Sequence, residues 1–449
     1  MASPHSLQVE TTYRHIIKLA LPISFAMLIP QFNFVTTNIF LGHYNQESLA
    51  IAGITGVYYL IFAMIGFGLN NGLQALIARR AGENRPEEIG KIFSQGIYIA
   101  FLIAAISIVL TWTLAPTILR RVIRSAGMAE KAIDFLKIRI WGLIFLYIYQ
   151  MRNALLVGTN QSKYLVFGTF AEAITNIIFD YGFIFGHFGF PELGLNGAAL
   201  ASIIAEFMGM FVIFLVIWRK GISKRFGLFS HFGWNAPIVK QILSISTPLI
   251  FQLAVSLISW EFFYVLVEHH GQEALAISNI MRNIFGIVGC ISWSFAATAA
   301  AMVSNVIGQG KHEKVQPLIL KIISITFTAS IVICILLNLF PQTLLSVFDQ
   351  DESFNQHAIP VIRIVTFAMV LMSFGTVWVN AVTGTGNSRI TFFIELVTIT
   401  LYSIYIWLVL EKFSLPITYG WMSEWLYWIS LFTLSWLYIR SGKWKAKVI

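Results

Sequence analysis

Long apolar stretches separated by short polar segments constrain this chain more than any other feature. Most of these stretches reach the twenty or so residues that an α-helix needs to cross the hydrocarbon core of a bilayer. A bilayer offers no water to backbone N–H and C=O groups, so runs this long and continuously apolar are expected to fold as helices. We therefore predict an all-α polytopic membrane protein with twelve transmembrane helices, near residues 17–41, 48–73, 94–116, 137–157, 164–186, 195–218, 243–267, 274–305, 317–341, 360–383, 390–411 and 418–439.

The composition excludes an ordinary soluble protein, because 57% of the 449 residues are hydrophobic and only 11% are charged. The net charge of +9 could suggest a nucleic-acid partner. Lys and Arg are, however, concentrated in the loops on the side that would hold both termini, as is typical of cytoplasmic loops. We expect a multi-pass protein of a bacterial inner membrane with both termini cytoplasmic, in contact with lipid and not with nucleic acid.

An internal repeat divides the chain into two halves. LGHYNQESLAIAGI at 41–54 aligns without gaps on VEHHGQEALAISNI at 267–280, and half of the positions are identical. The same displacement of 226 residues pairs Pro22 with Pro248. We expect two six-helix lobes related by a pseudo-twofold along the membrane normal. The predicted N-terminal lobe is 1–218, the cytoplasmic linker is 219–242, and the C-terminal lobe with its basic cytoplasmic tail is 243–449.

Three polar residues interrupt the apolar stretch that begins at Tyr164. Glu172, Asn176 and Asp180 follow one another at intervals of four residues, so they lie on or near one face of the predicted helix. A carboxylate that faces lipid costs several kcal/mol, so such side chains face a partner helix, a water-filled cavity or an ion. Two interpretations stay open: a hydrogen bond to a neighbouring helix, or a proton or cation site at Asp180 and Asn176, with Na⁺ as the metal.

Further polar residues inside predicted spans are candidates for a coupling site or a substrate cavity. The first helix has a polar run in which Gln31 and Asn33 are cavity candidates and Thr36 is a candidate oxygen ligand near Asp180. Ser202 could complete the same cation site. The remaining cavity candidates are Glu172, Glu261, Glu395 and Arg282. We expect Arg282 to pair with a carboxylate or to extend towards the membrane surface.

Several segments of the chain resemble the multidrug and toxic compound extrusion (MATE) transporters. They are NIIFDYGFIFG followed by GFPELGLNGAALAS, the paired turns GTNQSK and GTGNSR, and the loop ARRAGENRPEE after the second helix. The resemblance covers about residues 12–440, and IPQFNFVTTNIFLG resembles a branch common in Bacteroidetes-type bacteria. It implies efflux of organic, often cationic and aromatic compounds, driven by inward H⁺ or Na⁺, through a cavity between two six-helix lobes.

The resemblance also assigns roles to particular residues, and the chain departs from the family pattern at two of them. Asn176 and Asp180 match the N-x-x-x-D spacing of a cation site in one branch, and Ser202 corresponds most nearly to a hydroxyl of that site. Thr36 stands where that branch has an Asp in the first helix, and Ser256 stands about where another branch has a Glu. The coupling ion is therefore open between H⁺ and Na⁺.

These observations together predict a secondary active antiporter that exports small organic compounds in exchange for H⁺ or Na⁺ by alternating access. We expect a monomer with no cofactor beyond the coupling ion. The alternative is a flippase for a lipid-linked saccharide or another lipid-like substrate, which would need a strongly cationic cavity. We do not expect an enzyme, because no paired catalytic carboxylates, metal-spaced His residues or Ser/His/Asp set are evident.

Overall fold

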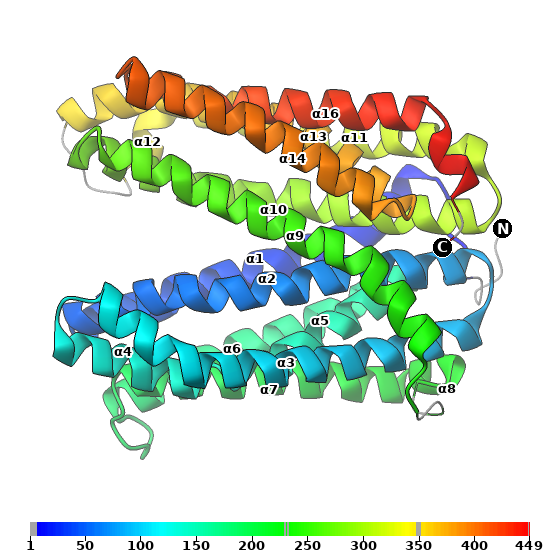
Figure 1. The fold of residues 1–449 in the computed structure, drawn as a ribbon, viewed down its shortest axis with the longest axis horizontal. Coiled ribbons are helices and arrows are strands. Elements are labelled where there is room, and N and C mark those ends of the chain that lie inside the picture. The colour runs from blue at the N-terminus through cyan, green and yellow to red at the C-terminus, as the bar shows by residue number, and fades with distance from the viewer. Residues whose placement is uncertain (1–6, 229, 231–232, 347–351, 448) are drawn as a thin grey trace. The chain divides into compact units, whose positions relative to one another are not determined.

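The computed structural model describes residues 7–228, 230, 233–346, 352–447 and 449 (Figure 1). Within these residues the regular structure is entirely helical, as the apolar runs predict. Nine of the described helices are long and apolar enough to cross a membrane on their own. The other three predicted spans fall on α4 and α5, on α6, and on α15 and α16, which are shorter or carry more polar residues. The twelve predicted spans therefore all correspond to helices.

The chain divides into two compact units, each described here by itself. The N-unit is Leu21–Ser246, and the C-unit is Thr247–Ile449 together with Met1–Ala20. The helix α1 (Tyr13–Tyr44) passes from the C-unit into the N-unit, and α9 (Ala236–Glu268) passes from the N-unit into the C-unit. The crossing points, at Leu21 and Thr247, are again separated by the 226 residues of the repeat, and each immediately precedes one of the paired prolines.

The other helices of the N-unit lie mostly side by side (Figure 1). They are α2 (Gln46–Gly82), α3 (Pro86–Val122), α4 (Ala126–Arg139), α5 (Gly142–Gly158), α6 (Leu165–Phe185), α7 (Leu195–Arg219) and α8 (Ile222–Phe226), with a 3₁₀ turn at Ser162–Tyr164. The predicted fourth span is interrupted between α4 and α5. The part of α4 before residue 137 was predicted to lie in a loop; it is helical and packs on α3 and α7.

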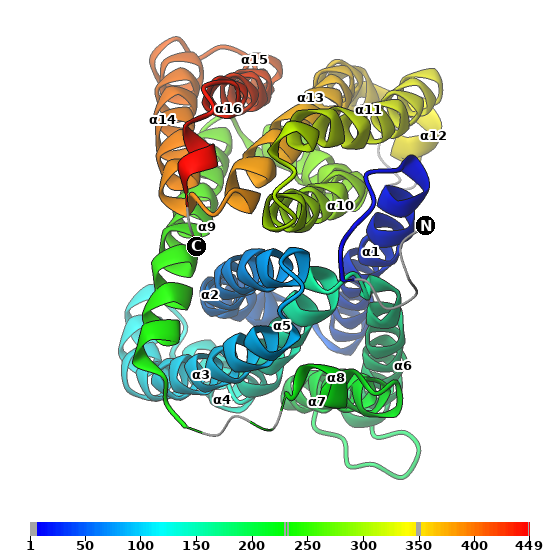
Figure 2. The same ribbon diagram turned by 90° about the vertical axis from the view of Figure 1, so that its right-hand side faces the viewer.

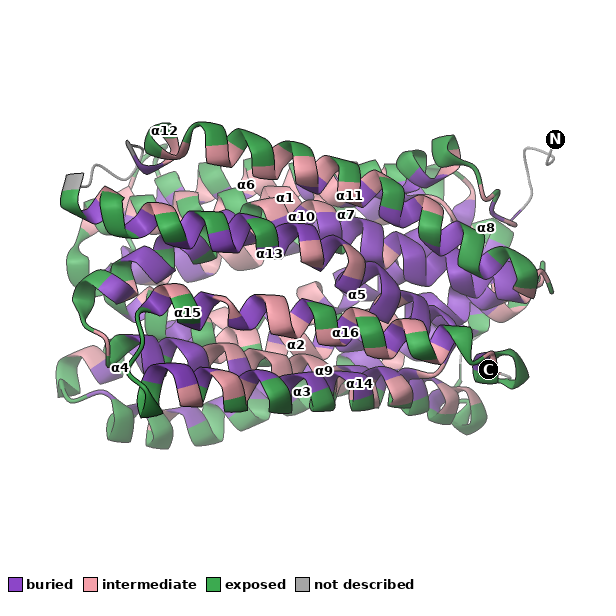
Figure 3. Ribbon diagram, turned by 90° about the horizontal axis from the view of Figure 1, so that it is seen from above, coloured by how far each residue is buried: buried purple, intermediate pink, exposed green. Residues whose placement is uncertain are grey.

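The C-unit is built around α10 and α13, the most buried long helices of the described chain (Figure 3). Its elements are α10 (Gln272–Gly308), α11 (Val315–Leu339), α12 (Pro341–Ser346), α13 (Glu352–Gly384), α14 (Ser388–Ile406), α15 (Ile417–Trp421) and α16 (Ser423–Arg440), with 3₁₀ turns at His312–Lys314 and Lys443–Ala446 and a π-helix at Trp407–Lys412. Figure 2 shows α11 and α13 beside α10 when the helices are seen end-on.

The start of the chain is held in the C-unit by a set of side chains that we call the first clasp. The Asn305 amide accepts a hydrogen bond from the Val9 N–H at 3.0 Å and donates one to the Leu7 carbonyl at 3.0 Å. Gln309 donates to the Val9 carbonyl at 3.1 Å, and Lys321 donates to the Thr11 carbonyl at 2.8 Å. Leu7, Val9 and Asn305 are all buried, so these bonds satisfy backbone groups that water does not reach.

The segment before α9 is held in the N-unit by an equivalent contact, the second clasp. The Gln95 amide donates to the Gly233 carbonyl at 2.8 Å and accepts from the Asn235 N–H at 3.0 Å. Gln95, Gly233 and Asn235 are the repeat partners of Lys321, Leu7 and Val9. Each half thus contributes the start of its first helix to the unit formed mainly by the other half. For this reason the unit boundaries differ from the lobe boundaries expected from the sequence, 1–218 and 243–449.

Replacing Asn305 with Leu is expected to lower the free energy of unfolding by about 2–4 kcal/mol. The substitution leaves one buried N–H and one buried C=O without partners, at roughly 1–3 kcal/mol each. Thermal denaturation of the detergent-solubilised protein measures the effect, with the exposed Gln272 at the start of the same helix changed to Leu as the control. Equal stability of the two variants would show that the first clasp does not hold the chain terminus.

Candidate functional site

The helix α6 carries the three polar residues singled out in the sequence, and close contact with α7 fixes its position. A Cβ atom at Gly168 would lie 2.3 Å from Cδ1 of Ile213, and one at Gly197 would lie 2.6 Å from the carbonyl oxygen of Phe183. Both distances are too short for any side chain, so only glycine permits this approach. The α6 residues that do not face α7 are therefore held in a defined orientation towards other helices.

Asp180 lies at the contact between α6 and α1. Its Oδ2 accepts a hydrogen bond of 2.6 Å from the hydroxyl of Thr37, which also lies 3.4 Å from the Asn176 amide oxygen. Asp180 is 1% exposed and Asn176 is 6% exposed. The second carboxylate oxygen of Asp180, Oδ1, is buried and has no hydrogen-bond partner among the described residues. The pairing of Asp180 with Asn176 on one face is as the spacing predicts.

Thr37, and not Thr36, is the residue of α1 that reaches Asp180. The Thr36 hydroxyl donates to the backbone carbonyl of Phe32 in its own helix at 2.9 Å. The contact with Asp180 is therefore made by Thr37, one position after the predicted Thr36. Consecutive residues of an α-helix point about 100° apart, so only one of two adjacent threonines can face α6.

The structure does not link Ser202 to this group. Ser202 is half-buried on α7, and its hydroxyl forms no hydrogen bond with any described residue. Gln31 is exposed and Asn33 is half-buried on α1, and neither side chain is hydrogen-bonded within the described part of the chain. Their assignment to a substrate cavity stays a prediction.

Glu172 lies against α7 and not with Asp180. A Cβ atom added at Gly209 would lie 3.0 Å from Cβ of Glu172 and 3.2 Å from its Oε2. The carbonyl of Gly209 accepts a hydrogen bond of 3.2 Å from Arg152, a fully buried residue of α5 that also stacks on Tyr149 at 4.2 Å. A carboxylate and a guanidinium group therefore border the same glycine, a neighbourhood of opposite charges that favours a structural role for Glu172.

An ion pair that no sequence pattern indicated joins α4 to α7, with Glu206 buried and Arg139 half-buried. Arg139 makes two hydrogen bonds to the Glu206 carboxylate, the shorter of 2.6 Å, and its guanidinium carbon lies 3.9 Å from the centre of the Tyr59 ring. The Tyr59 hydroxyl donates to Glu206 at 3.2 Å. Bidentate geometry and ring stacking are what arginine provides and lysine does not. No ion pair joins Asp180 to a basic residue in the described chain.

In the C-unit, Glu395 of α14 is surrounded by donors from two other helices. It accepts hydrogen bonds from Ser256 at 2.6 Å, from Tyr427 at 2.5 Å and from Gln252 at 3.2 Å, and it is 2% exposed. Ser256 is the position at which the resemblance expects a carboxylate in another branch. The carboxylate lies on the facing helix instead. Tyr427 and Gln252 were not identified from the sequence, because their spacing to Glu395 is long and follows no motif.

Arg282 does not form the expected ion pair. Its guanidinium carbon lies 5.5 Å from the centre of the Tyr264 ring, and no ion pair to a carboxylate is found within the described residues. Glu261 is half-buried one turn before Tyr264 on α9. Arg282 is exposed, so a partner is not required to compensate for burial. Of the two expectations for Arg282, pairing with a carboxylate is not seen among the described residues, and extension towards the membrane surface stays a prediction.

Comparison with known proteins identifies the family to which the chain belongs. The family model described as MatE matches the chain twice, at residues 22–182 and 248–408, with the displacement of 226 residues that the repeat predicts. The chain belongs to the MatE family of transporters. It is therefore not an enzyme, and the predicted class of all-α multi-pass membrane protein with two sets of six helices is confirmed.

Relatives named as multidrug resistance proteins match most of the chain. A probable multidrug resistance protein NorM from Thermotoga maritima is 25% identical over 447 residues, 98% of this chain and 95% of the relative. A protein of the same name from Synechocystis is 24% identical and covers 81% of the chain and 80% of the relative.

Solved structures of this family share the fold. A structure described as the outward-facing conformation of a multidrug resistance MATE family transporter has a TM-score of 0.90 at 17% identity, covering 98% of both chains. A transporter of the MOP superfamily from Pyrococcus furiosus, described as having a binding pocket of reverse polarity, has a TM-score of 0.89 at 17% identity and covers 99% of this chain and all of the other.

Replacing Glu206 with Gln is expected to lower the free energy of unfolding by roughly 3–5 kcal/mol, because it leaves the Arg139 charge buried without a counter-ion. The exposed pair between Arg120 and Glu130 provides the matched control. Changing Glu130 to Gln should have little effect on stability, because solvent screens an exposed ion pair. Thermal unfolding of both variants tests the contrast, and similar losses in the two would mean that the Arg139 pair is not held away from water.

Proposed function

We propose that this transporter is a secondary active antiporter that exports small organic compounds in exchange for H⁺ or Na⁺, with Asp180 as the ion-binding carboxylate. The main support for this proposal is the environment of the Asp180 carboxylate. It is buried, one of its oxygens has no hydrogen-bond partner, and it forms no ion pair with a basic residue among those described. An ionised carboxylate in such a place is costly. A proton or a monovalent cation at Oδ1 removes that cost.

The neighbours of Asp180 are compatible with either ion. For Na⁺, Oδ1 of Asp180, the amide oxygen of Asn176 and the hydroxyl oxygen of Thr37 provide hard oxygen ligands. For H⁺, the carboxyl group alone is sufficient. No group of three or more His, Cys, Asp or Glu residues suited to a metal occurs in the described residues, and a single carboxylate fits a monovalent ion better than a tightly held divalent one.

The proposed mechanism couples ion binding to substrate release by alternating access. The ion binds Asp180 from outside and stabilises a helix arrangement with low affinity for the substrate, and its release inside restores the arrangement that accepts substrate. By thermodynamic linkage the substrate must weaken ion binding by the same factor. Because Asp180 bridges α6 and α1 through Thr37, the bound ion acts directly on the packing of these two helices.

The substrate class rests on the relatives that are named multidrug resistance proteins. We expect small organic substrates, often cationic and aromatic, and no cofactor beyond the coupling ion. The concentration of Lys and Arg on one side supports cytoplasmic termini in a bacterial inner membrane, and we expect a monomer. The flippase alternative has no comparable support from these relatives.

Asp180 is preferred to Glu395 as the coupling residue because their surroundings differ. Glu395 is saturated by three donors, whereas Asp180 has one donor and a free oxygen that can take an ion. Glu261 stays a candidate for a second coupling site.

Asp180→Asn is expected to abolish ion-driven transport, because the amide can neither take up a proton near neutral pH nor provide a charged ligand. Uptake of ethidium or norfloxacin into inverted proteoliposomes under an imposed pH or Na⁺ gradient measures this and identifies the ion. Asp134→Asn, on the exposed face of α4, is the matched control. Full transport by Asp180→Asn would assign Asp180 a structural role.

The two adjacent threonines provide a sharper test of the geometry. Thr37→Val removes the hydrogen bond to Oδ2 and should change the apparent affinity for the coupling ion by about threefold to tenfold, since a bond to a charged group contributes roughly 1 kcal/mol or more. Thr36→Val should leave it unchanged. Ion titrations of transport rate compare the two, and a larger effect of Thr36→Val would contradict the placement of Asp180 beside Thr37.

A further inference from the structure

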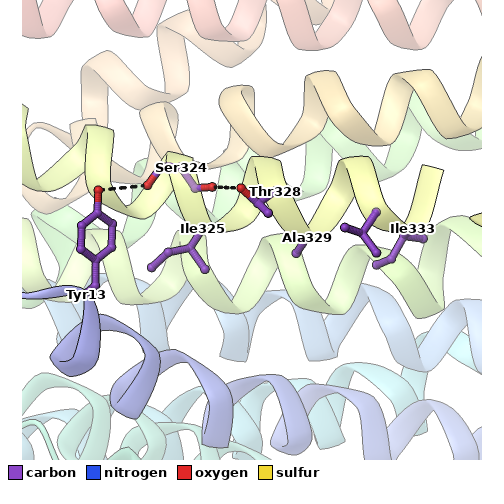
Figure 4. Close-up of a pocket in the computed structure, with 7 residues that line it drawn as sticks. Tyr13, Ser324, Ile325, Thr328, Ala329 and Ile333 are labelled. Carbon is purple, nitrogen blue, oxygen red and sulfur yellow. Dashed lines mark hydrogen bonds between the residues drawn. The ribbon is translucent and has the colours of Figure 1, made fainter. Parts of the chain in front are cut away.

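A groove of about 700 Å³ lies on the C-unit between the start of α1 and the outer side of α11. Tyr13 closes one side of it, and residues of α11 from Ser324 to Ile333 form its floor (Figure 4). Every lining residue belongs to the C-unit and is among those described. Because the protein spans a membrane, the exposed side of α11 is covered by lipid, and the chemistry of the groove decides which lipid fits best.

The groove is polar at one end and apolar at the other. At the polar end the Ser324 hydroxyl lies 3.5 Å from the Tyr13 hydroxyl, and Thr328 follows one turn later on α11. Beyond it the lining consists of Ala329, Val332 and Ile333. From Ser324 to Ile333 the helix rises roughly 14 Å at 1.5 Å per residue, about half the thickness of a hydrocarbon core. This is the length and polarity profile of one acyl chain with its ester region.

One basic residue lies at the polar end, and others lie next to it in sequence. Lys321 lies one turn before Ser324, with its ammonium group 5.7 Å from the centre of the Tyr13 ring. Arg14 and Lys18 are exposed on the first turns of α1, next to Tyr13 in sequence. The acidic residues nearest in sequence, Glu10 and Glu313, are fewer than the basic ones, which also include Lys314, the last residue of the 3₁₀ turn before α11. The polar end therefore has a net positive charge.

We propose that this groove binds an anionic phospholipid, with an acyl chain along Ala329 to Ile333 and the phosphate between Tyr13, Lys321 and the first turns of α1. A zwitterionic lipid would fill the apolar part equally well and would lack the net charge that the basic residues attract. Each basic residue near the headgroup contributes about a fivefold preference for a negative lipid. The bound lipid joins the start of α1 to α11 and so supports the segment that the first clasp holds.

Native mass spectrometry and thermal unfolding in mixed micelles test this proposal with phosphatidylglycerol and phosphatidylcholine as probes. The wild-type protein should retain phosphatidylglycerol at several-fold higher affinity and gain more thermal stability from it than from phosphatidylcholine. Ala329→Trp, which fills the groove, should abolish the retained lipid. Ala105→Trp on an exposed position of α3 introduces the same ring elsewhere and should retain it.

A charge variant separates the headgroup from the acyl chain. Arg14→Gln combined with Lys18→Gln leaves the Lys321 contact to Thr11 in place, and it should remove most of the preference for phosphatidylglycerol while phosphatidylcholine binding persists. Equal binding of the two lipids by the wild-type protein would overturn the proposal. So would unchanged phosphatidylglycerol binding in Ala329→Trp, provided that this variant unfolds at the temperature of Ala105→Trp.

Discussion

Charge cannot be left uncompensated in a medium without water, and this constraint organises both units. In the N-unit, Glu206 is held by Arg139, and Glu172 and Arg152 border the same glycine of α7. In the C-unit, Glu395 is held by three neutral donors. Asp180 is the exception, since only one of its oxygens is satisfied. Its buried, unpartnered oxygen distinguishes Asp180 from Glu206 and Glu395, whose carboxylate oxygens each accept a hydrogen bond.

The fold could be predicted from the sequence because hydropathy and the internal repeat are patterns that extend over many residues. Runs of apolar residues determine where helices cross the membrane, and the repeat at 226 residues is the same displacement that separates the two family matches and the two crossing points between units. Local features were less certain. The break between α4 and α5, at Ile140 and Trp141, lies inside the predicted fourth span, and no Pro or Gly directly before Gly142 signals it.

The candidate site could be predicted only in part from the sequence. Helical spacing indicates which residues of one helix share a face, but it does not indicate which residues of different helices are in contact. The spacing of Asn176 and Asp180 predicts that they share a face, and they do. Which of two neighbouring threonines meets that face depends on the rotation of α1 about its axis, which periodicity does not determine. The pairing of Arg139 with Glu206 joins two residues 67 positions apart on different helices, which no spacing motif in the sequence relates.

The two clasps have a consequence for how the chain is made. Val9 and its partner Asn305 are 296 residues apart. At a synthesis rate of roughly 5–20 residues per second, Asn305 is made on the order of 15–60 s after Val9, and the first clasp cannot form before then. Gln95, in contrast, is synthesised before residues 233–235, so the second clasp can form as soon as these residues are made. The N-unit can therefore form its clasp during synthesis, whereas the bonds of Val9 and Thr11 to Asn305, Gln309 and Lys321 can form only after the second half has been made.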